Sequence, residues 1–226
     1  MQRMLVLMIG LVLFVGVQPI LAQSQNAERA EKIAEARKKN AALLRQYSWT
    51  SRTELKEDGK VRDIRVELVN YGPNGQLQRT PLNEQGASMP RGFLRRHVAE
   101  EKKHKTQEYL TGLRSLLDQY TLPTTGKVLD FIDRAQVRLP GPGGLVLLTG
   151  NNVVNPGDSM SLWVDAGTHQ TRKVEIKSTY KGDPVTVTAT FKALPGGPTH
   201  LEYAEVEVPA KNMSLQVHNF NYTRSE

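Results

Sequence analysis

The sequence predicts a mainly β fold with added helices, in which about ten antiparallel strands form a sheet that curls and is interrupted by a helical insertion. Three observations predict it. Segments that alternate apolar and polar residues, separated by Gly, Pro, Asn and Asp turns, fill the chain before residue 88 and after residue 135. Residues 88–135 show helical spacing instead. The last two strand segments shift the face that is apolar, and the β-bulges that cause such shifts let a sheet curl.

A helix is predicted first. Residues 27–46 contain no Gly or Pro, and Ala30, Ala34, Ala41 and Leu44 belong to one narrow apolar stripe. A face made mostly of alanine can lie close against a sheet, but it buries little apolar surface.

A three-stranded meander with one solvent-exposed face follows this helix. Its first two strands alternate in polarity over residues 47–55 and 64–68. Turns are predicted at Asp58-Gly59 and at Pro73-Asn74-Gly75, because these residue types favour tight hairpins.

The helical insertion is placed at about residues 88–135. Its apolar residues recur three and four positions apart, which indicates one long helix or two shorter ones up to about residue 120. A short helix is expected near Gly126–Arg134.

Strands return from Gln136 onward. Leu145–Thr149 is a continuous apolar run, which is typical of a strand covered on both faces. The remaining predicted strands are Met160–Asp165, a long hairpin over 172–180 and 184–194, and then Leu201–Val208 and Met213–Tyr222.

Residues 1–22 have the form of a cleavable signal peptide, with Arg3, an apolar run and Ala22 before the expected cut. The run of about 14 residues is shorter than a membrane span needs. Gln23 stands where a lipidated cysteine would be required, and the chain has no cysteine at all. Since a sizeable cysteine-free secreted protein fits a bacterial periplasm best, we expect residues 23–226 to form one soluble periplasmic domain.

The basic residues are concentrated in the insertion. The chain carries a formal charge of +7, and its densest cluster is Arg91, Arg95, Arg96, Lys102, Lys103 and Lys105. This cluster is either the solvated face of a helix or a patch that meets anionic lipid head groups or an acidic envelope protein. Nucleic acid is not expected as a partner, because the chain is exported and no interleaved aromatic residues support base stacking.

Neither catalysis nor metal binding is indicated. His97 and His104 share a helical face, but no further ligands stand at the spacing of a zinc site. Asp130 and Asp133 lie three apart without a visible partner base. We therefore expect a protein that is not an enzyme and that holds no metal or cofactor.

The candidate ligand site is the apolar side of the predicted sheet. Such a face either packs on the helical insertion or lines a cavity for an apolar ligand, and both hold if the helices cover only part of it. The candidate wall residues are Trp49, Ile64, Val66, Leu68, Val174, Ile176, Val187, Phe191 and Leu215.

One segment also resembles a known family. Trp163-Val164-Asp165, a short turn and the basic and aliphatic strand Arg172–Ile176 resemble the strand–turn–strand of LolA/LolB-like exported proteins. The helix followed by Tyr47-Ser48-Trp49-Thr50 and a meander is also similar, and the resemblance covers most of residues 27–222.

The resemblance implies an incomplete curved barrel with helices as a lid over an apolar cavity. The best-known members carry the acyl chains of lipoproteins across the periplasm, and relatives sense misfolded envelope proteins or bind other amphiphiles. This sequence departs from the family in its long basic insertion, and no residue was matched to the arginine that gates the lid of the carrier.

Two hypotheses follow. In the first, the chain is a monomeric, non-enzymatic carrier that holds a lipid, an acylated protein or another amphiphile in a half-barrel cavity. In the alternative, it is an interaction or stress-sensing module whose helical insertion binds an envelope protein or a membrane surface.

Overall fold

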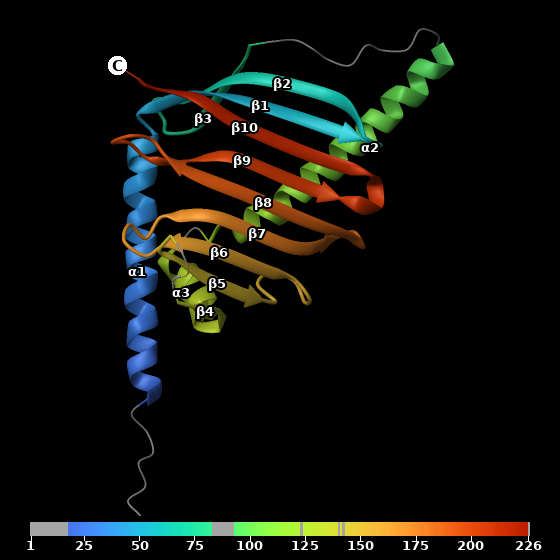
Figure 1. Ribbon diagram of the computed structural model, residues 1–226. Helices are drawn as coiled ribbons and strands as arrows, with labels where there is room; N and C mark the ends of the chain where they lie inside the picture. Colours follow the sequence, from blue (N-terminus) through green and yellow to red (C-terminus); the bar gives the residue numbers. More distant parts are fainter. Residues whose placement is uncertain (1–17, 83–92, 123, 140, 142, 226) are drawn as a thin grey trace, which may run out of the picture.

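The computed structural model describes residues 18–82, 93–122, 124–139, 141 and 143–225 (Figure 1). Its helices are α1 (Gln18–Leu44), α2 (Phe93–Asp118), η1 (Gln119–Thr121), α3 (Thr125–Arg134) and η2 (Pro209–Lys211). Its strands are β1 (Tyr47–Glu57), β2 (Lys60–Tyr71), β3 (Leu77–Pro81), β4 (Gln136–Arg138), β5 (Leu145–Asn151), β6 (Ser159–Asp165), β7 (Thr171–Tyr180), β8 (Asp183–Ala193), β9 (Thr199–Val208) and β10 (Met213–Arg224).

The ten described strands form one antiparallel sheet in the order β3-β2-β1-β10-β9-β8-β7-β6-β5-β4. The order follows the chain except at one place, where the C-terminal strand β10 pairs with β1. The sheet curves strongly and does not close, because β3 and β4 remain as separate edges (Figure 1). This is the incomplete, curved LolA-like barrel with a helical insertion that the sequence predicts.

The helices lie at one end of the strands and across one face of the sheet, which we call the inner face (Figure 1). α1 stands along the strand ends, where the Asn40 side chain exchanges two hydrogen bonds of 2.6 Å with the backbone of Thr199. α2 runs obliquely across the inner face, and α3 lies beside α1 under β5 (Figure 1). In the part of the chain that the structure describes, no helix is long and apolar enough to span a membrane.

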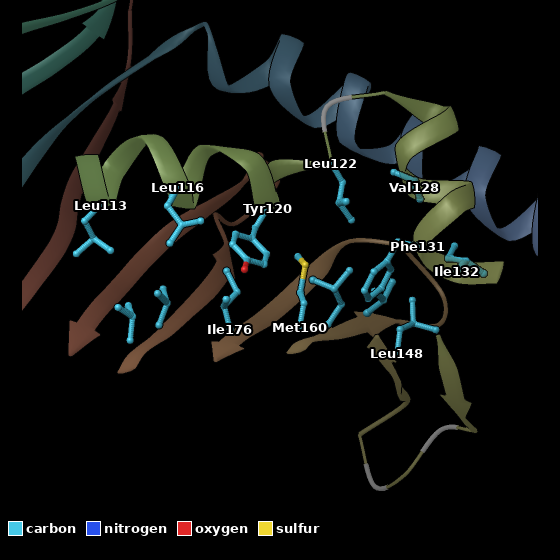
Figure 2. Packing of buried hydrophobic residues seen from close by; sticks show 14 of the residues in the cluster. Leu113, Leu116, Tyr120, Leu122, Val128, Phe131, Ile132, Leu148, Met160 and Ile176 are labelled. Atoms are coloured by element: carbon cyan, nitrogen blue, oxygen red, sulfur yellow. The ribbon is translucent and has the colours of Figure 1, made fainter. Parts of the chain in front are cut away.

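The core lies between the helices and the β5–β9 half of the inner face. Figure 2 shows Leu113 and Leu116 of α2 above the sheet, and Phe131 of α3 beside Leu148. Gly150 of β5 allows the Phe131 ring to pack this closely on the strand, since a Cβ at this position would lie 2.5 Å from the ring. Deep burial of a glycine strand position is a common sign of close packing by a neighbour.

Three features of the structure refine the sequence prediction. α1 begins at Gln18, so the expected cleavage after Ala22 falls within this helix and stays a prediction. Register shifts interrupt β9 near Glu202 and β10 near Asn221. Both lie close to the points where the sequence pattern moves its apolar residues from one strand face to the other. Two more shifts, near Arg62 in β2 and Arg172 in β7, were not foreseen.

Candidate functional site

Part of the inner face is apolar and lies outside the core. Direct pairing aligns Leu55, Leu215 and Val206 in one row across β1, β10 and β9. The next row continues across β10, β9 and β8. All of these side chains are half-buried. We call Leu55, Ala189, Ala204, Val206, Leu215 and Val217 the inner strip.

The inner strip begins at the edge of the core that the helices cover. Leu55 and Val206 pack against the edge of the buried cluster, whereas Leu215 and Val217 do not belong to it. The two alanines that pair directly, Ala189 and Ala204, project little side-chain volume from the sheet. The strip is therefore a half-buried apolar surface beside the core.

A cleft of about 590 Å³ opens at one end of the inner strip, between α2 and three strand-connecting turns. Its wall is mostly polar and carries both signs of charge. The lining residues are Glu57, Asp58, Lys105, Thr106, Glu108, Tyr109, Lys181, Asp183, Lys211 and Met213. A second hollow of about 450 Å³ shares Glu108 and Lys181 with it.

Two hydrogen bonds hold α2 over this cleft. The Tyr109 hydroxyl donates to Asp183 Oδ2 at 2.9 Å, and Thr106 Oγ1 donates to Glu57 at 3.2 Å. Lys211 completes the first contact, with its ammonium 3.4 Å from Asp183 and 4.7 Å from the centre of the Tyr109 ring. Burial, together with the carboxylate of Asp183, raises the pKa of the Tyr109 hydroxyl well above its usual value, so this group stays a donor.

A buried polar network fixes the other end of the long helix. The Tyr120 hydroxyl donates to Asp158 Oδ2 at 2.5 Å and lies 2.9 Å from Ser178 Oγ. Burial and the bond to Asp158 raise the pKa of Tyr120 to about 12. Burial alone would raise the pKa of Asp158, but three backbone amides from the turn at Val153, Val154 and Asn155 and the Tyr120 hydroxyl outweigh it and lower that pKa.

α1 supports the same junction from outside. The guanidinium of the half-buried Arg37 donates to the carbonyl of Leu122 at 3.1 Å and to that of Thr121 at 3.0 Å. Leu122 has a left-handed backbone, with φ of 48°, where the chain leaves η1. Arg37 thus satisfies two carbonyls that the end of the helical segment leaves without helical partners.

The structure places six of the nine predicted wall residues on the inner face. Ile176 and Val187 lie in the buried core, while Val174 and Leu215 are half-buried. Phe191 is half-buried two positions beyond Ala189 on the same strand face. Trp49 lies apart, stacked on the Tyr222 ring at 5.4 Å, and only 7% of it is exposed.

The other three, Ile64, Val66 and Leu68, lie on the outer face of the sheet and are not brought together with Trp49. Without a register shift, the two-residue turn at Asp58-Gly59 would place Leu68 opposite Trp49. The shift at Arg62 moves the pairing by one residue, so that Val69 faces Trp49 instead. A one-residue shift exchanges the two faces of a strand.

The predicted basic patch is only partly described. Lys105 is exposed and forms an i, i+4 ion pair of 2.8 Å with Glu101. The remaining members lie outside the described residues or side chains: Arg91, and on α2 Arg95, Arg96, Lys102 and Lys103. The patch as a whole stays a prediction.

Of the residues that line the cleft, sequence reasoning had singled out only Lys105 as a candidate site residue. Tyr109, Asp183 and Lys211 come from α2, the start of β8 and η2, and no short motif joins them. The Asp58-Gly59 turn was recognised only as a hairpin. Among the described residues, no group of three or more His, Asp or Glu side chains is placed to hold a metal ion.

Comparison with known proteins finds similar chains only among solved structures, since no family model matches and no curated protein matches. A DUF1329 family protein from Desulfovibrio piger is 10% identical over 92% of this chain and 94% of that chain, with a TM-score of 0.39. A putative outer membrane lipoprotein-sorting protein domain from Vibrio parahaemolyticus is 13% identical over 86% and 93%, with a TM-score of 0.40. A LolA superfamily protein from Nitrosomonas europaea is 12% identical over 87% and 94%, with a TM-score of 0.37.

The fold is LolA-like: a long, curved, open antiparallel sheet with a helical insertion on its inner face. At TM-scores of 0.37–0.40 the likeness assigns neither a ligand nor a function to this chain.

Proposed function

We propose that this chain is a periplasmic, non-enzymatic carrier that holds the apolar part of an amphiphile, such as a lipid or the acyl chain of a lipoprotein, against the inner strip. The observation that carries the proposal is the position of this strip. It is a continuous apolar part of the inner face, outside the buried cluster and next to a polar cleft.

The physical basis is removal of apolar surface from water. Each buried methylene of a ligand contributes about 0.8 kcal/mol, so even a short acyl segment on the strip offsets a large part of the cost of association. Ala189 and Ala204 project little side-chain volume toward such a segment, and their neighbours Leu215 and Val217 offer larger apolar side chains for contact with it.

The test is to purify the protein from its bacterial host under mild, detergent-free conditions and to identify bound molecules by native mass spectrometry and organic extraction. Leu215→Gln places a polar group in the strip, and Ala204→Leu fills it without adding polarity. Leu68→Gln is the matched control, because Leu68 is 39% exposed on the outer face. Thermal melts check that each variant folds.

We expect a co-purifying amphiphile in the wild type and in Leu68→Gln, and about tenfold less of it in Leu215→Gln and Ala204→Leu. A wild-type protein that carries no amphiphile contradicts the proposal, as does an equal loss in the inner-face and outer-face variants.

The alternative, an envelope interaction module, predicts a different dependence. Charge reversal at Arg95, Arg96, Lys102 and Lys103 would then abolish capture of a protein partner and leave the lipid content unchanged. If lipid content falls instead, the basic segment serves the carrier.

A further inference from the structure

The inner strip is long across the strands and short along them. It reaches over four neighbouring strands, β1, β10, β9 and β8, but takes at most two inward-facing positions from each. Neighbouring strands lie about 4.8 Å apart, so the strip extends over about 14 Å across the sheet. Its width is about 7 Å, the separation of two positions on the same face of one strand.

An ion pair on β2 marks one end of the strip. Asp63 pairs directly with Leu55, and Arg65 pairs with Thr53, which in turn pairs with Val217. The Arg65 guanidinium donates to Asp63 Oδ2 at 2.9 Å, and the Arg65 side chain is 62% exposed. A polar group at this end therefore keeps its contact with water and avoids the cost of burial.

The buried core marks the other end. In the row of Ala189 the next residue is Val174, which packs against the buried cluster. In the row of Val206 the next residue is Val187, which belongs to that cluster. Because this end is apolar, it suits the methyl end of a hydrocarbon chain and not a polar head group.

Polar groups also limit the width of the strip. Beyond Val217 on the same face of β10, Asn219 pairs directly with Ser51. In the described part of the chain, the buried Oδ1 atom of Asn219 has no hydrogen-bond partner, and hydrocarbon packed against it would leave this acceptor unsatisfied. Beyond Leu215, Glu57 and the polar cleft follow. A hydrocarbon chain is about 4 Å wide at van der Waals contact, so the strip accommodates one chain and not two side by side.

We propose that the inner strip binds one unbranched acyl chain of about 11 carbons, with the methyl end at Ala189 and the polar head group at the Asp63–Arg65 pair. An extended hydrocarbon advances about 1.3 Å per carbon, since its bonds are about 1.5 Å long, and about 11 carbons therefore cover the strip. The proposal rests on the carrier function above and names its ligand class, a single-chain amphiphile of medium chain length.

Two series of single-chain probes test the length. Fatty acids and lysophosphatidylcholines, each with acyl chains of eight to sixteen carbons, are compared below their micelle concentrations by displacement of the uncharged fluorophore N-phenyl-1-naphthylamine. Two head groups separate the effect of the chain from that of the head. The wild-type series tests the length without any variant.

Two variants test the orientation. Ala189→Leu and Ala189→Val add three and two carbons at the core end of the strip. Thr188→Leu is the matched control, because Thr188 lies on the same strand with its side chain on the outer face, where it pairs with Glu175 and Glu205. Thermal melts check that each variant folds.

In the wild type and in Thr188→Leu, affinity should rise about two- to fourfold per methylene and level off near 11 carbons in both series. Ala189→Leu should make it level off about three carbons earlier, and Ala189→Val about two, while the eight-carbon probes bind as they do to the wild type. A rise that continues to sixteen carbons overturns the assigned length, and an equal loss at every length in the folded Ala189 variants overturns the orientation. Either result leaves the carrier function standing. Failure of both series to bind the wild type overturns the carrier function itself.

Discussion

Gly112 gives the sharpest test of how α2 is seated on the sheet. A Cβ at this position would lie 1.8 Å from the Tyr180 hydroxyl oxygen and 2.9 Å from Cζ of the same ring. The Tyr180 ring is itself packed edge-on against Tyr109, with centroids 5.0 Å apart. Gly112→Ala therefore forces either the helix or this pair of rings to move.

The size of the effect follows from two opposing contributions. An ordinary contact of 3.4 Å requires a displacement of about 1.6 Å, and overpacking of this kind costs about 1–3 kcal/mol. Replacing a glycine inside a helix by alanine stabilises the folded protein by about 1 kcal/mol through helix propensity. The net effect is a loss of about 0–2 kcal/mol, so we expect Gly112→Ala to lower the free energy of unfolding by about 1 kcal/mol.

Gly126→Ala in α3 is the matched control. Its new Cβ meets only Thr124 Oγ1 at 3.9 Å, so the helix-propensity gain acts without a clash. Urea titrations followed by far-UV circular dichroism should place the two variants about 2 kcal/mol apart. Tyr180→Leu combined with Gly112→Ala should recover part of the loss. If Gly112→Ala is as stable as Gly126→Ala, α2 does not rest on Tyr180 as described.

Three further predictions concern the parts that hold the insertion in place. Arg37→Leu should lower the free energy of unfolding by about 2 kcal/mol in urea titrations, because two carbonyls lose their charged donor. Arg37→Lys should restore only part of this lost stability. Equal stability of the wild type and both variants would contradict this role. The carboxylate of Asp158 has a lowered pKa, so its contribution is complete above the ordinary value of 3.8 and is lost as the pH falls below it. Asp158→Asn should thus be less stable at pH 6 and show a weaker loss of stability as the pH falls from about 4 to about 2 in the same assay. An unchanged pH profile would count against the network. Gly150→Ala should cost about 3 kcal/mol, since the buried Phe131 ring cannot withdraw, and Phe131→Leu in the same chain should relieve it, as thermal melts would show.

The sequence predicts the order and kind of nearly all elements, because alternation and helical spacing are local properties. Which face a strand turns inward is not local. Ile64, Val66 and Leu68 alternate as expected, yet the single extra residue at Arg62 directs them outward. A bulge of this kind changes neither composition nor period in the sequence, so only the pairing reveals it.

The cleft could not be predicted for a related reason. Tyr109 and Asp183 are 74 positions apart, and their contact depends on the angle at which α2 crosses the strands. The same holds for Tyr120, which reaches Asp158 over 38 positions. Sequence spacing carries information about partners within a helix turn or a hairpin, but not across layers.

The pairing of β10 with β1 has a consequence for how the chain acquires its structure. The 12 residues of β10 complete the middle of the sheet, between the N-terminal meander and all later strands. Until they arrive, β1 has an open edge and the meander is not paired with the later strands of the sheet. Pairings between such distant segments form slowly. Because β10 lies in the middle of the sheet, the chain cannot complete folding before this last strand is free to pair. A ribosome or export channel that still holds the C-terminus therefore keeps the sheet incomplete.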